Sequence, residues 1–401
     1  MKVEIIILLG IFLSFNLATK ELQLLQVLTR HGDRTPIFPL PSKTVSWYCK
    51  LTDETYPTTS SMNQNTTKLN RIHKRIYIED RELLAGNCSA GQLTSIGAQQ
   101  HYQMGLQFRQ TYIKNMKFLP DQFDSNLIWI RSTDIPRTRD SVQNNFRGLY
   151  PPQTSLSYDE VFPLYTVDFD FDWIYANSVL CPRIGFLAQN LFRSSEWINH
   201  MTQIQTLTEE LMEIFNVSES EISYIWINDD LTCRKAHNIS FPDGVTTEIA
   251  EQVHDEAQWE LAAIYAYQEV ANLSIGLLVR DMIQAMEASI NKTSELKYLF
   301  YSAHDSSVAP FLQAYNVYDG IIIAYAGHIV LELYYDEDVQ KYYVQMIYNG
   351  NPLQIPGCDS TYCDFDFFQS VSYQIIPQNY EALCHSTSNE DFLDDFFWNL
   401  N

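Results

Sequence analysis

Three short apolar runs, each followed at once by charged or polar residues, constrain the fold of this 401-residue chain more than any other feature. They occupy residues 22–29 (LQLLQVLT), 127–130 (LIWI) and 298–302 (YLFYS), and a fourth run at 329–335 alternates apolar residues with Glu332. Their length and their β-branched and aromatic content are typical of buried strands. Each of the first three leads into a turn and then a loop or helix, which predicts an α/β domain with a mostly parallel sheet.

Helix signals follow the same runs. A proline in the first turn predicts a helix over residues 136–147, which a glycine and a proline then end. Thr94 predicts the N-cap of a second helix that extends toward residue 112. Ser306 or Ser307 predicts the N-cap of a third helix after the last of the three runs.

The middle of the chain, residues 185–279, has a different character. It is polar and contains long stretches with helical patterning at 206–215 and 246–270. We interpret it as an α-helical cap inserted into the sheet domain, whose two parts then span residues 20–184 and 280–401.

The N-terminal residues 1–19 have the pattern of a secretory signal peptide. An apolar run at 5–15 follows Lys2 and ends before the small residue Ala18, and it is too short for a spanning helix. An N-terminal core strand is the alternative. No later segment is long and apolar enough to cross a bilayer, and the acidic tail at 391–401 lacks the features of a GPI signal, so we expect no membrane anchor.

Glycosylation sequons support the same compartment. Six N-x-S/T motifs are present, and together with a signal peptide they favour a glycosylated protein that is secreted or delivered to the lysosomal lumen. The acceptor residues are Asn65, Asn87, Asn216, Asn238, Asn272 and Asn291.

The cysteines point to an oxidising compartment. There are seven, none in a C-x-x-C motif, and no Cys/His spacing indicates zinc or another metal. In a secreted protein they predict disulfides with one cysteine left over. Buried free thiols are the alternative, which would suit a cytosolic protein better.

The charge balance excludes several classes of partner. There are 49 acidic and 26 basic residues, which gives a net charge of −23 with histidine neutral. Phosphate backbones require a basic face, so we expect no nucleic-acid binding, and an anionic membrane surface fits no better. An anionic ligand therefore needs a local cluster of arginines that overrides the overall field.

Such a cluster is predicted where the three strands end. Arg-His-Gly-Asp-Arg follows the first run, Arg-Ser-Thr-Asp the second and His-Asp the third. In open α/β sheets, ligands bind outside the carboxyl ends of the strands, so neighbouring strands would bring these side chains together. The candidate residues are Arg30, Arg34, Arg131, His31, His304 and Asp305.

These residue types suit phosphoryl transfer. Arginine forks bind phosphate oxygens bidentately, and nearby positive groups would lower the pKa of His31 and keep its imidazole neutral and nucleophilic. Asp305, beside a histidine, could donate a proton to a leaving alcohol. A surface ion-pair cluster and a capped strand–helix turn are the structural alternatives. Arg137 and Arg139 could extend the positive field, but we interpret them as residues that pair on a helix surface.

The motif Arg30-His31-Gly32-x-Arg34-x-Pro36, paired with the late His304-Asp305, resembles the histidine acid phosphatase family, close to the prostatic and lysosomal enzymes. The resemblance runs from about residue 22 to Cys384. It implies a phosphoglycerate mutase-like fold, with a mixed, mostly parallel sheet, flanking helices and an inserted α-helical cap. It also implies a homodimer and no metal or other cofactor.

Site roles are carried over residue by residue. His31 resembles the nucleophile that becomes transiently phosphorylated, and Asp305 resembles the proton donor to the leaving group. The groups that resemble the phosphate-binding set are Arg30, Arg34, Arg131 and His304. The resemblance also implies two disulfides, Cys181–Cys384 and Cys358–Cys363.

The chain departs from the vertebrate enzymes at three cysteines. A third bridge there would use Cys233, but its partner position is occupied by Gly327. Cys49 and Cys88 have no counterparts in those relatives, and we expect them to pair with each other and leave Cys233 free. An insertion at residues 41–86 could contribute to the rim of the pocket.

Other phosphatase classes fit poorly. The acidic segment at 168–172 (DFDFD) resembles an aspartate-nucleophile motif, but we interpret it as a solvated loop. No cysteine has an arginine six positions later, and no P-loop motif is present.

The sequence therefore predicts a metal-independent acid phosphatase that hydrolyses small phosphate monoesters or phosphorylated peptides through His31. A phytase acting on inositol phosphates is the alternative within the enzymes, although residues 185–279 supply few basic side chains. A secreted glycoprotein that lost its activity and acts as a binder is the non-enzyme alternative.

Overall fold

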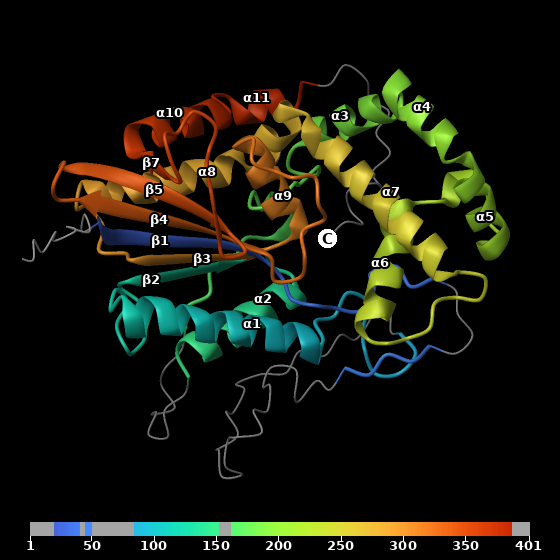
Figure 1. The fold of residues 1–401 in the computed structure, drawn as a ribbon, viewed down its shortest axis with the longest axis horizontal. Helices are drawn as coiled ribbons and strands as arrows, with labels where there is room; N and C mark the ends of the chain where they lie inside the picture. Colours follow the sequence, from blue (N-terminus) through green and yellow to red (C-terminus); the bar gives the residue numbers. More distant parts are fainter. Residues whose placement is uncertain (1–19, 41–44, 50–83, 152–161, 387–401) are drawn as a thin grey trace, which may run out of the picture.

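The computed structural model describes residues 20–40, 45–49, 84–151 and 162–386. The predicted signal peptide, the sequon at Asn65 and most of the insertion after residue 41 lie outside the described residues. Figure 1 shows a sheet with helices on both faces and a group of helices beside one end of it.

Seven strands form one sheet, in the order β2-β3-β1-β4-β5-β6, with β7 paired to β5. Their bounds are β1 Lys20–Arg30, β2 Ile128–Ser132, β3 Tyr298–Ala303, β4 His328–Asp336, β5 Lys341–Tyr348, β6 Asn351–Leu353 and β7 Tyr362–Asp364. The four predicted apolar runs form β1 to β4, and β3 lies between β1 and β2, parallel to both. Their carboxyl ends therefore meet at one edge, as predicted.

The prediction that this mixed sheet is mostly parallel is wrong. Only β1–β3 and β2–β3 pair in parallel within the described sheet, while the pairs β1–β4, β4–β5, β5–β6 and β5–β7 are antiparallel. The four residues between β4 and β5 are too few for the crossover that parallel strands need, and they suit a hairpin. After β4 the chain therefore turns back and adds antiparallel strands at the edge of the sheet opposite β2.

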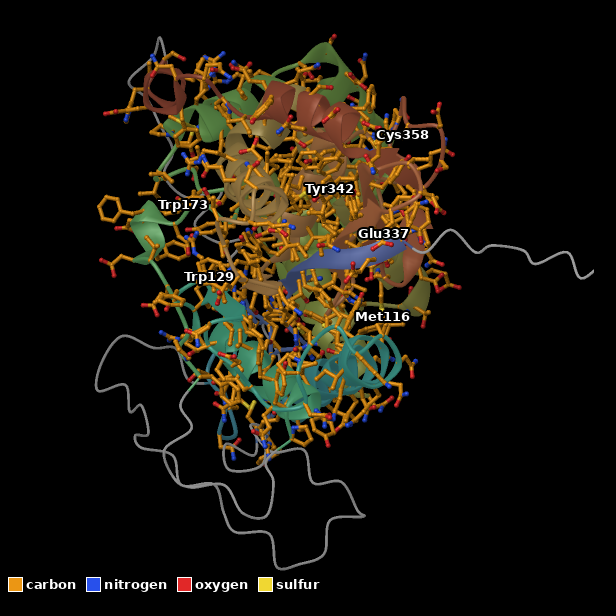
Figure 2. All side chains as sticks on the ribbon, turned by 90° about the vertical axis from the view of Figure 1, so that its left-hand side faces the viewer. Met116, Trp129, Trp173, Glu337, Tyr342 and Cys358 are labelled. Carbon is orange, nitrogen blue, oxygen red and sulfur yellow. A yellow bond between two sulfur atoms is a disulfide. The ribbon has the colours of Figure 1, made fainter. Side chains whose placement is uncertain are left out.

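Strand β1 is buried on both faces, which explains its almost continuous apolar sequence. Leu25 and Val27 pack in one core with helices α1 (Ser95–Phe108) and α2 (Pro136–Leu149), while Leu24 and Leu28 belong to a second core on the opposite face. In Figure 2, β1 (blue) crosses the centre of the molecule with side chains above and below it.

The predicted helices are present, with one different start. Helix α1 has Thr94 as its N-cap, and α2 begins at Pro136. Helix α9 (Asp305–Ala314) begins at Asp305, with His304 in the extended N-cap conformation, and not after Ser306 or Ser307 as predicted. The backbone N–H of His304 donates to the Ser307 hydroxyl at 3.3 Å, so this serine closes the first turn from inside the helix.

A group of helices lies between β2 and β3 in the sequence: α3 Pro182–Phe192, α4 Ser195–Gln203, α5 Gln205–Phe215, α6 Tyr224–Ala236, α7 Thr247–Ala266 and α8 Gln268–Ile290. In Figure 1, α4 to α7 stand beside the sheet, whereas α8 lies across its upper face. Gln26 of β1 donates to the Met282 carbonyl at 3.0 Å, so α8 packs directly on the sheet. The cap boundary predicted at residue 279 falls inside α8.

The remaining elements are short or C-terminal: a π-helical turn at Arg109–Asn115, 3₁₀ turns at Phe169–Phe171 and Glu219–Glu221, α10 Phe365–Ile375 and α11 Tyr380–Cys384. No single helix in the described part of the chain is long and apolar enough to span a membrane, and α7 with α8 would qualify only as a pair bent by 76°.

The structure contains the three disulfides expected from the sequence, Cys49–Cys88, Cys181–Cys384 and Cys358–Cys363. Cys233 is a buried free thiol, as expected. The Cys181–Cys384 bridge joins the start of α3 to the last described helix across 203 residues of sequence.

Candidate active site

The candidate site lies where β1, β2 and β3 end. His31 directly follows β1, and its backbone N–H donates to the Ala303 carbonyl at 3.0 Å. Thr133, which follows β2, donates its N–H to the Ser302 carbonyl at 3.2 Å. Backbone hydrogen bonds therefore hold the ends of β1, β2 and β3 side by side. This placement does not depend on side-chain contacts.

His31 is buried, with 2% of its surface exposed. Its Nδ1 lies 2.8 Å from the Gly32 carbonyl, which can only accept, so Nδ1 carries the proton and Nε2 keeps its lone pair. The pKa of His31 is well below 6.5 because burial and then the charges of Arg137, Arg30 and Arg34 disfavour the imidazolium. A neutral imidazole with Nε2 unprotonated is a nucleophile.

Gly32 is required by a close approach of two backbones. A Cβ atom at Gly32 would lie 2.4 Å from the Gly97 carbonyl oxygen, and one at Gly97 would lie 2.2 Å from the Asp33 carbonyl oxygen. The loop after β1 therefore rests directly on the first turn of α1. This contact holds the backbone around His31 in place.

Arg30 and Arg34 both carry a carboxylate partner. Arg30 Nη2 lies 2.7 Å from Asp305 Oδ2, and its guanidinium packs 4.4 Å from the centre of the Tyr325 ring. Arg34 Nη1 lies 2.7 Å from Asp229 Oδ1, on helix α6. The same tyrosine ring lies 5.9 Å from the His31 ring, so Tyr325 packs against both the histidine and Arg30.

Arg131 lies in a different setting from the one predicted. Its Nη2 is 2.6 Å from Asp172 Oδ1, and its guanidinium packs 4.2 Å from the centre of the Trp173 ring. Asp172 is fully buried, which corrects the interpretation of residues 168–172 as a solvated loop at this position. Burial raises the pKa of Asp172 to about 6, against the opposing effect of Arg131.

Arg137 is the site residue that the sequence interpretation missed. It is buried, and neither its Nε nor its Nη2 has a hydrogen-bond partner among the described residues. Burial and the charge of Arg34 lower its pKa to about 9, and of all charged groups Arg137 lowers the pKa of His31 most. A signal for it exists in the sequence: an arginine in the first turn of α2 opposes the helix dipole, which a structural role does not explain.

His304 and Asp305 complete the group. His304 is fully buried, with Nε2 3.0 Å from the Thr133 hydroxyl and its ring 5.6 Å from that of His31. Burial and then Arg137 hold the pKa of His304 well below 6.5. The Asp305 side chain is 27% exposed, which makes it the most accessible of these groups.

The structure thus brings together His31, His304, Asp305, Arg30 and Arg34 of the predicted set and adds Arg137. No group of three or more His, Cys, Asp or Glu side chains that could hold a metal ion occurs within the described ranges. The arrangement offers a neutral imidazole, several guanidinium groups and one accessible carboxyl, which suits transfer of a phosphoryl group from an alcohol to histidine.

Five of the six sequons are described. Asn87, Asn216, Asn238 and Asn291 are exposed. Asn272 lies inside α8 with a half-buried side chain that accepts a hydrogen bond from Gln268 at 2.9 Å, so it is the least accessible of the five.

The fold and the candidate site define an α/β protein with a buried, neutral histidine among arginines at a strand end, and comparison with known proteins identifies the family. The family model of the histidine phosphatase superfamily (branch 2) matches residues 21–349, and the chain belongs to this family. It is an acid phosphatase of the histidine acid phosphatase type, a phosphoric monoester hydrolase, as the sequence motif predicted.

Counting factor 60 of Dictyostelium discoideum is 32% identical to the chain, over 94% of this chain and 91% of that protein. Lysosomal acid phosphatase of Xenopus laevis is 28% identical, over 92% of this chain and 80% of that protein. A solved phytase from Klebsiella sp. ASR1 has the same fold, with a TM-score of 0.62 and 13% identity over 90% of this chain and 98% of the phytase.

Proposed function

We propose that this phosphatase hydrolyses phosphate monoesters by way of a phosphohistidine on His31. Nε2 attacks phosphorus while the bond from phosphorus to the ester oxygen breaks, and protonated Asp305 gives its proton to the departing alcohol. Water then attacks the phosphohistidine, Asp305 takes up a proton from that water, and inorganic phosphate leaves with Nε2 free again.

The observation that carries this proposal is the protonation state of His31. Its Nδ1–H is directed to the Gly32 carbonyl and its pKa is well below the ordinary value, so the attacking nitrogen stays unprotonated under acidic conditions. Here both features converge on one nitrogen at a strand end.

The arginines would bind the phosphate and stabilise charge on its equatorial oxygens. Arg30 is the last residue of β1 and Arg34 lies in the loop after it, and we propose Arg137 in place of Arg131 as the third. Its two unpartnered nitrogens and its lowered pKa mark a buried cation that an anion would stabilise. Arg131 already has a buried carboxylate partner in Asp172.

The charge arrangement favours substrates with a single phosphate group. Arg34 is paired with Asp229 and Arg131 with Asp172, so the cations around the site are partly neutralised before substrate enters. We propose small phosphate monoesters and phosphorylated peptides as the substrate class, turned over without a metal or other cofactor. A preference for phytate over an aryl phosphate at equal concentration would contradict this.

We infer a secreted or lysosomal location, a glycosylated chain without a membrane anchor, and a homodimer. Three disulfides and four exposed sequon asparagines support the compartment, and one relative is a lysosomal enzyme by name. Light scattering of the purified protein tests the dimer. Glycosidase treatment of protein from secreting cells tests the glycans.

The test of the function compares wild type with His31→Ala on p-nitrophenyl phosphate at pH 5 in EDTA. Wild type should turn over in chelator, and His31→Ala should lose several orders of magnitude of kcat. His385→Ala, a change in an exposed histidine near the end of the described chain, is the matched control and should retain full activity. Retention of most of the rate by His31→Ala would contradict the proposal.

A further inference from the structure

Asp33 is a buried carboxylate placed between the two key residues of the loop, His31 and Arg34. Its backbone N–H donates to the Gln100 side chain at 2.8 Å, and its carbonyl accepts from Thr94 N at 3.0 Å. Its Oδ2 accepts from the Thr94 hydroxyl as well. These bonds tie Asp33 to the first turn of α1, whose dipole favours a negative charge there.

A second partner reaches Asp33 from the helical group. His237, the C-cap residue of α6, has Nε2 2.7 Å from Asp33 Oδ2. The His237 ring packs edge-on against Trp47, with ring centres 5.5 Å apart, and its side chain is 20% exposed. Because a carboxylate only accepts, His237 donates the hydrogen bond.

The same helix holds the other end of the loop. Asp229 pairs with Arg34 at 2.7 Å and accepts the Ile37 N–H at 2.8 Å. Eight residues along a helix span about 12 Å, so α6 contacts the loop at two well-separated points. Figure 1 shows the chain that leaves β1 (blue) running toward α6.

We propose that His237 is a positioning residue for the phosphatase reaction. By adding a contact from α6 to the one that Asp33 makes with Thr94, it fixes the backbone between His31 and Arg34 and thereby the distance from the nucleophile to a phosphate-binding guanidinium. This inference rests on the proposed roles of those two residues. It gives α6 a part in aligning the reacting groups.

The physical reason is that the Asp33 carboxylate has few other hydrogen-bond partners, although its backbone is well held. Its Oδ1 has no hydrogen-bond partner among the described residues, so the loss of His237 leaves the carboxylate with Thr94 as its side-chain partner. A buried carboxylate that is poorly paired moves toward water or rearranges its neighbours. A shift of about 1 Å in reacting groups can cost about 100-fold in rate.

The test replaces His237 with phenylalanine, which keeps the ring and removes the donor, and with glutamine, whose amide nitrogen can take the place of Nε2. His237→Phe should lower kcat by about 10- to 100-fold and weaken inhibition by inorganic phosphate. His237→Gln should recover at least half of the lost activity on a logarithmic scale. Neither change alters the sequon at Asn238.

His200→Phe is the matched control. His200 also pairs with a carboxylate in the helical group, Glu256 at 2.6 Å, and its side chain is 22% exposed, but it lies on α4 away from the loop. It should leave kcat and KM within about twofold of wild type. A kcat for His237→Phe as close to wild type as that of His200→Phe would overturn the proposal, and so would failure of His237→Gln to recover activity.

A double-mutant cycle with Asp33→Asn separates positioning from general destabilisation. If His237 acts through Asp33, adding His237→Phe to Asp33→Asn lowers kcat by much less than it does in wild type. Independent, multiplicative losses of kcat would overturn the proposal. If the phenylalanine variant does not fold, the cycle can use His237→Asn, whose shorter side chain does not reach Asp33. Activity in His31→Ala refutes the proposed function itself, whereas an inactive His31→Ala with a fully active His237→Phe refutes only this inference.

Discussion

Two buried arginines near the site, Arg131 and Arg137, differ in their partners. Arg131 forms an ion pair with Asp172, which is fully buried, whereas Arg137 has two nitrogens without partners in the described structure. A buried ion pair stabilises the fold only while both members are present, and a buried cation without a partner costs stability while it awaits an anion. The two residues should therefore respond in opposite ways to the same substitution.

We predict that Arg137→Met lowers kcat/KM by about 10³-fold or more while the melting temperature stays the same or rises. Arg131→Met should lower the free energy of unfolding by about 3 to 5 kcal/mol because Asp172 is left unpaired, with a smaller effect on catalysis in the protein that remains folded. Thermal melts and steady-state kinetics on both variants measure this. The reverse pattern would restore Arg131 as the phosphate ligand.

The pKa of His31 makes a prediction for the acid side of the pH profile. Because this pKa is well below 6.5, the nucleophile stays neutral as the pH falls through 6.5, and kcat/KM should show no loss centred on that pH. A loss of activity centred near pH 6.5 on the acid side would show an ordinary histidine.

At the residue scale, most of the proposed site residues can be predicted from the sequence, but the complete set of phosphate-binding arginines cannot. The proposed nucleophile, His31, and the proposed proton donor, Asp305, could be predicted because each lies just after an apolar strand and belongs to a recognisable motif. Arg131 lies near the end of β2, but it pairs with Asp172, which looks like part of a solvated acidic segment in sequence. Arg137 looks like a helix-surface residue until the packing of α2 buries it.

At the scale of elements, the parallel core of the sheet was predictable and its antiparallel half was not. β1, β2 and β3 are mostly buried and each contains an apolar run, because helices cover both faces, and that pattern is visible in sequence. β5 begins with exposed and half-buried residues, and β6 and β7 have three residues each, so they carry a weak signal. The sequence predicts the N-cap of α9 two or three residues too late, at Ser306 or Ser307, because histidine is an unusual N-cap.

Helix α7 contains a buried acid that should make the fold sensitive to pH. Burial, and then the nearby Glu256, raise the pKa of Glu260 to about 8. The folded protein therefore holds a proton at Glu260 that the unfolded chain releases above its ordinary pKa of about 4.5. The contribution to stability is complete below that value and is lost as the pH rises toward about 8.

We predict that Glu260→Gln is as stable as wild type at pH 4 and more stable at pH 8. The difference should grow by up to about 1.4 kcal/mol for each pH unit within that interval. Chemical denaturation of both proteins across the range measures it. A difference that does not depend on pH would show that Glu260 has an ordinary pKa in the folded protein.

At the scale of the whole molecule, one covalent link closes a loop of about half the chain. Cys181–Cys384 joins residues 203 positions apart and holds α11 against α3, whereas Cys358–Cys363 closes a loop of five. A cross-link stabilises mainly by restricting the unfolded chain, and the effect grows with the length of the closed loop.

Replacing Cys181 and Cys384 together by serine should cost about 2 to 5 kcal/mol of unfolding free energy. The matched double change at Cys358 and Cys363 should cost roughly half as much, because its loop is short. Urea denaturation under non-reducing conditions compares the two variants. Equal losses would show that local packing, and not loop closure, sets the value of these bridges.

The central claim of this account is a covalent phosphohistidine on His31, and direct trapping tests it. Enzyme mixed with an aryl phosphate at pH 5 is quenched within milliseconds into alkali, where phosphohistidine survives, and its peptides are analysed by mass spectrometry. The account predicts one phosphorylated peptide, with the phosphate on His31, absent from His31→Ala and abundant in Asp305→Asn when a good leaving group is used. Phosphate on another residue, or turnover with no trapped intermediate in either enzyme, would contradict it.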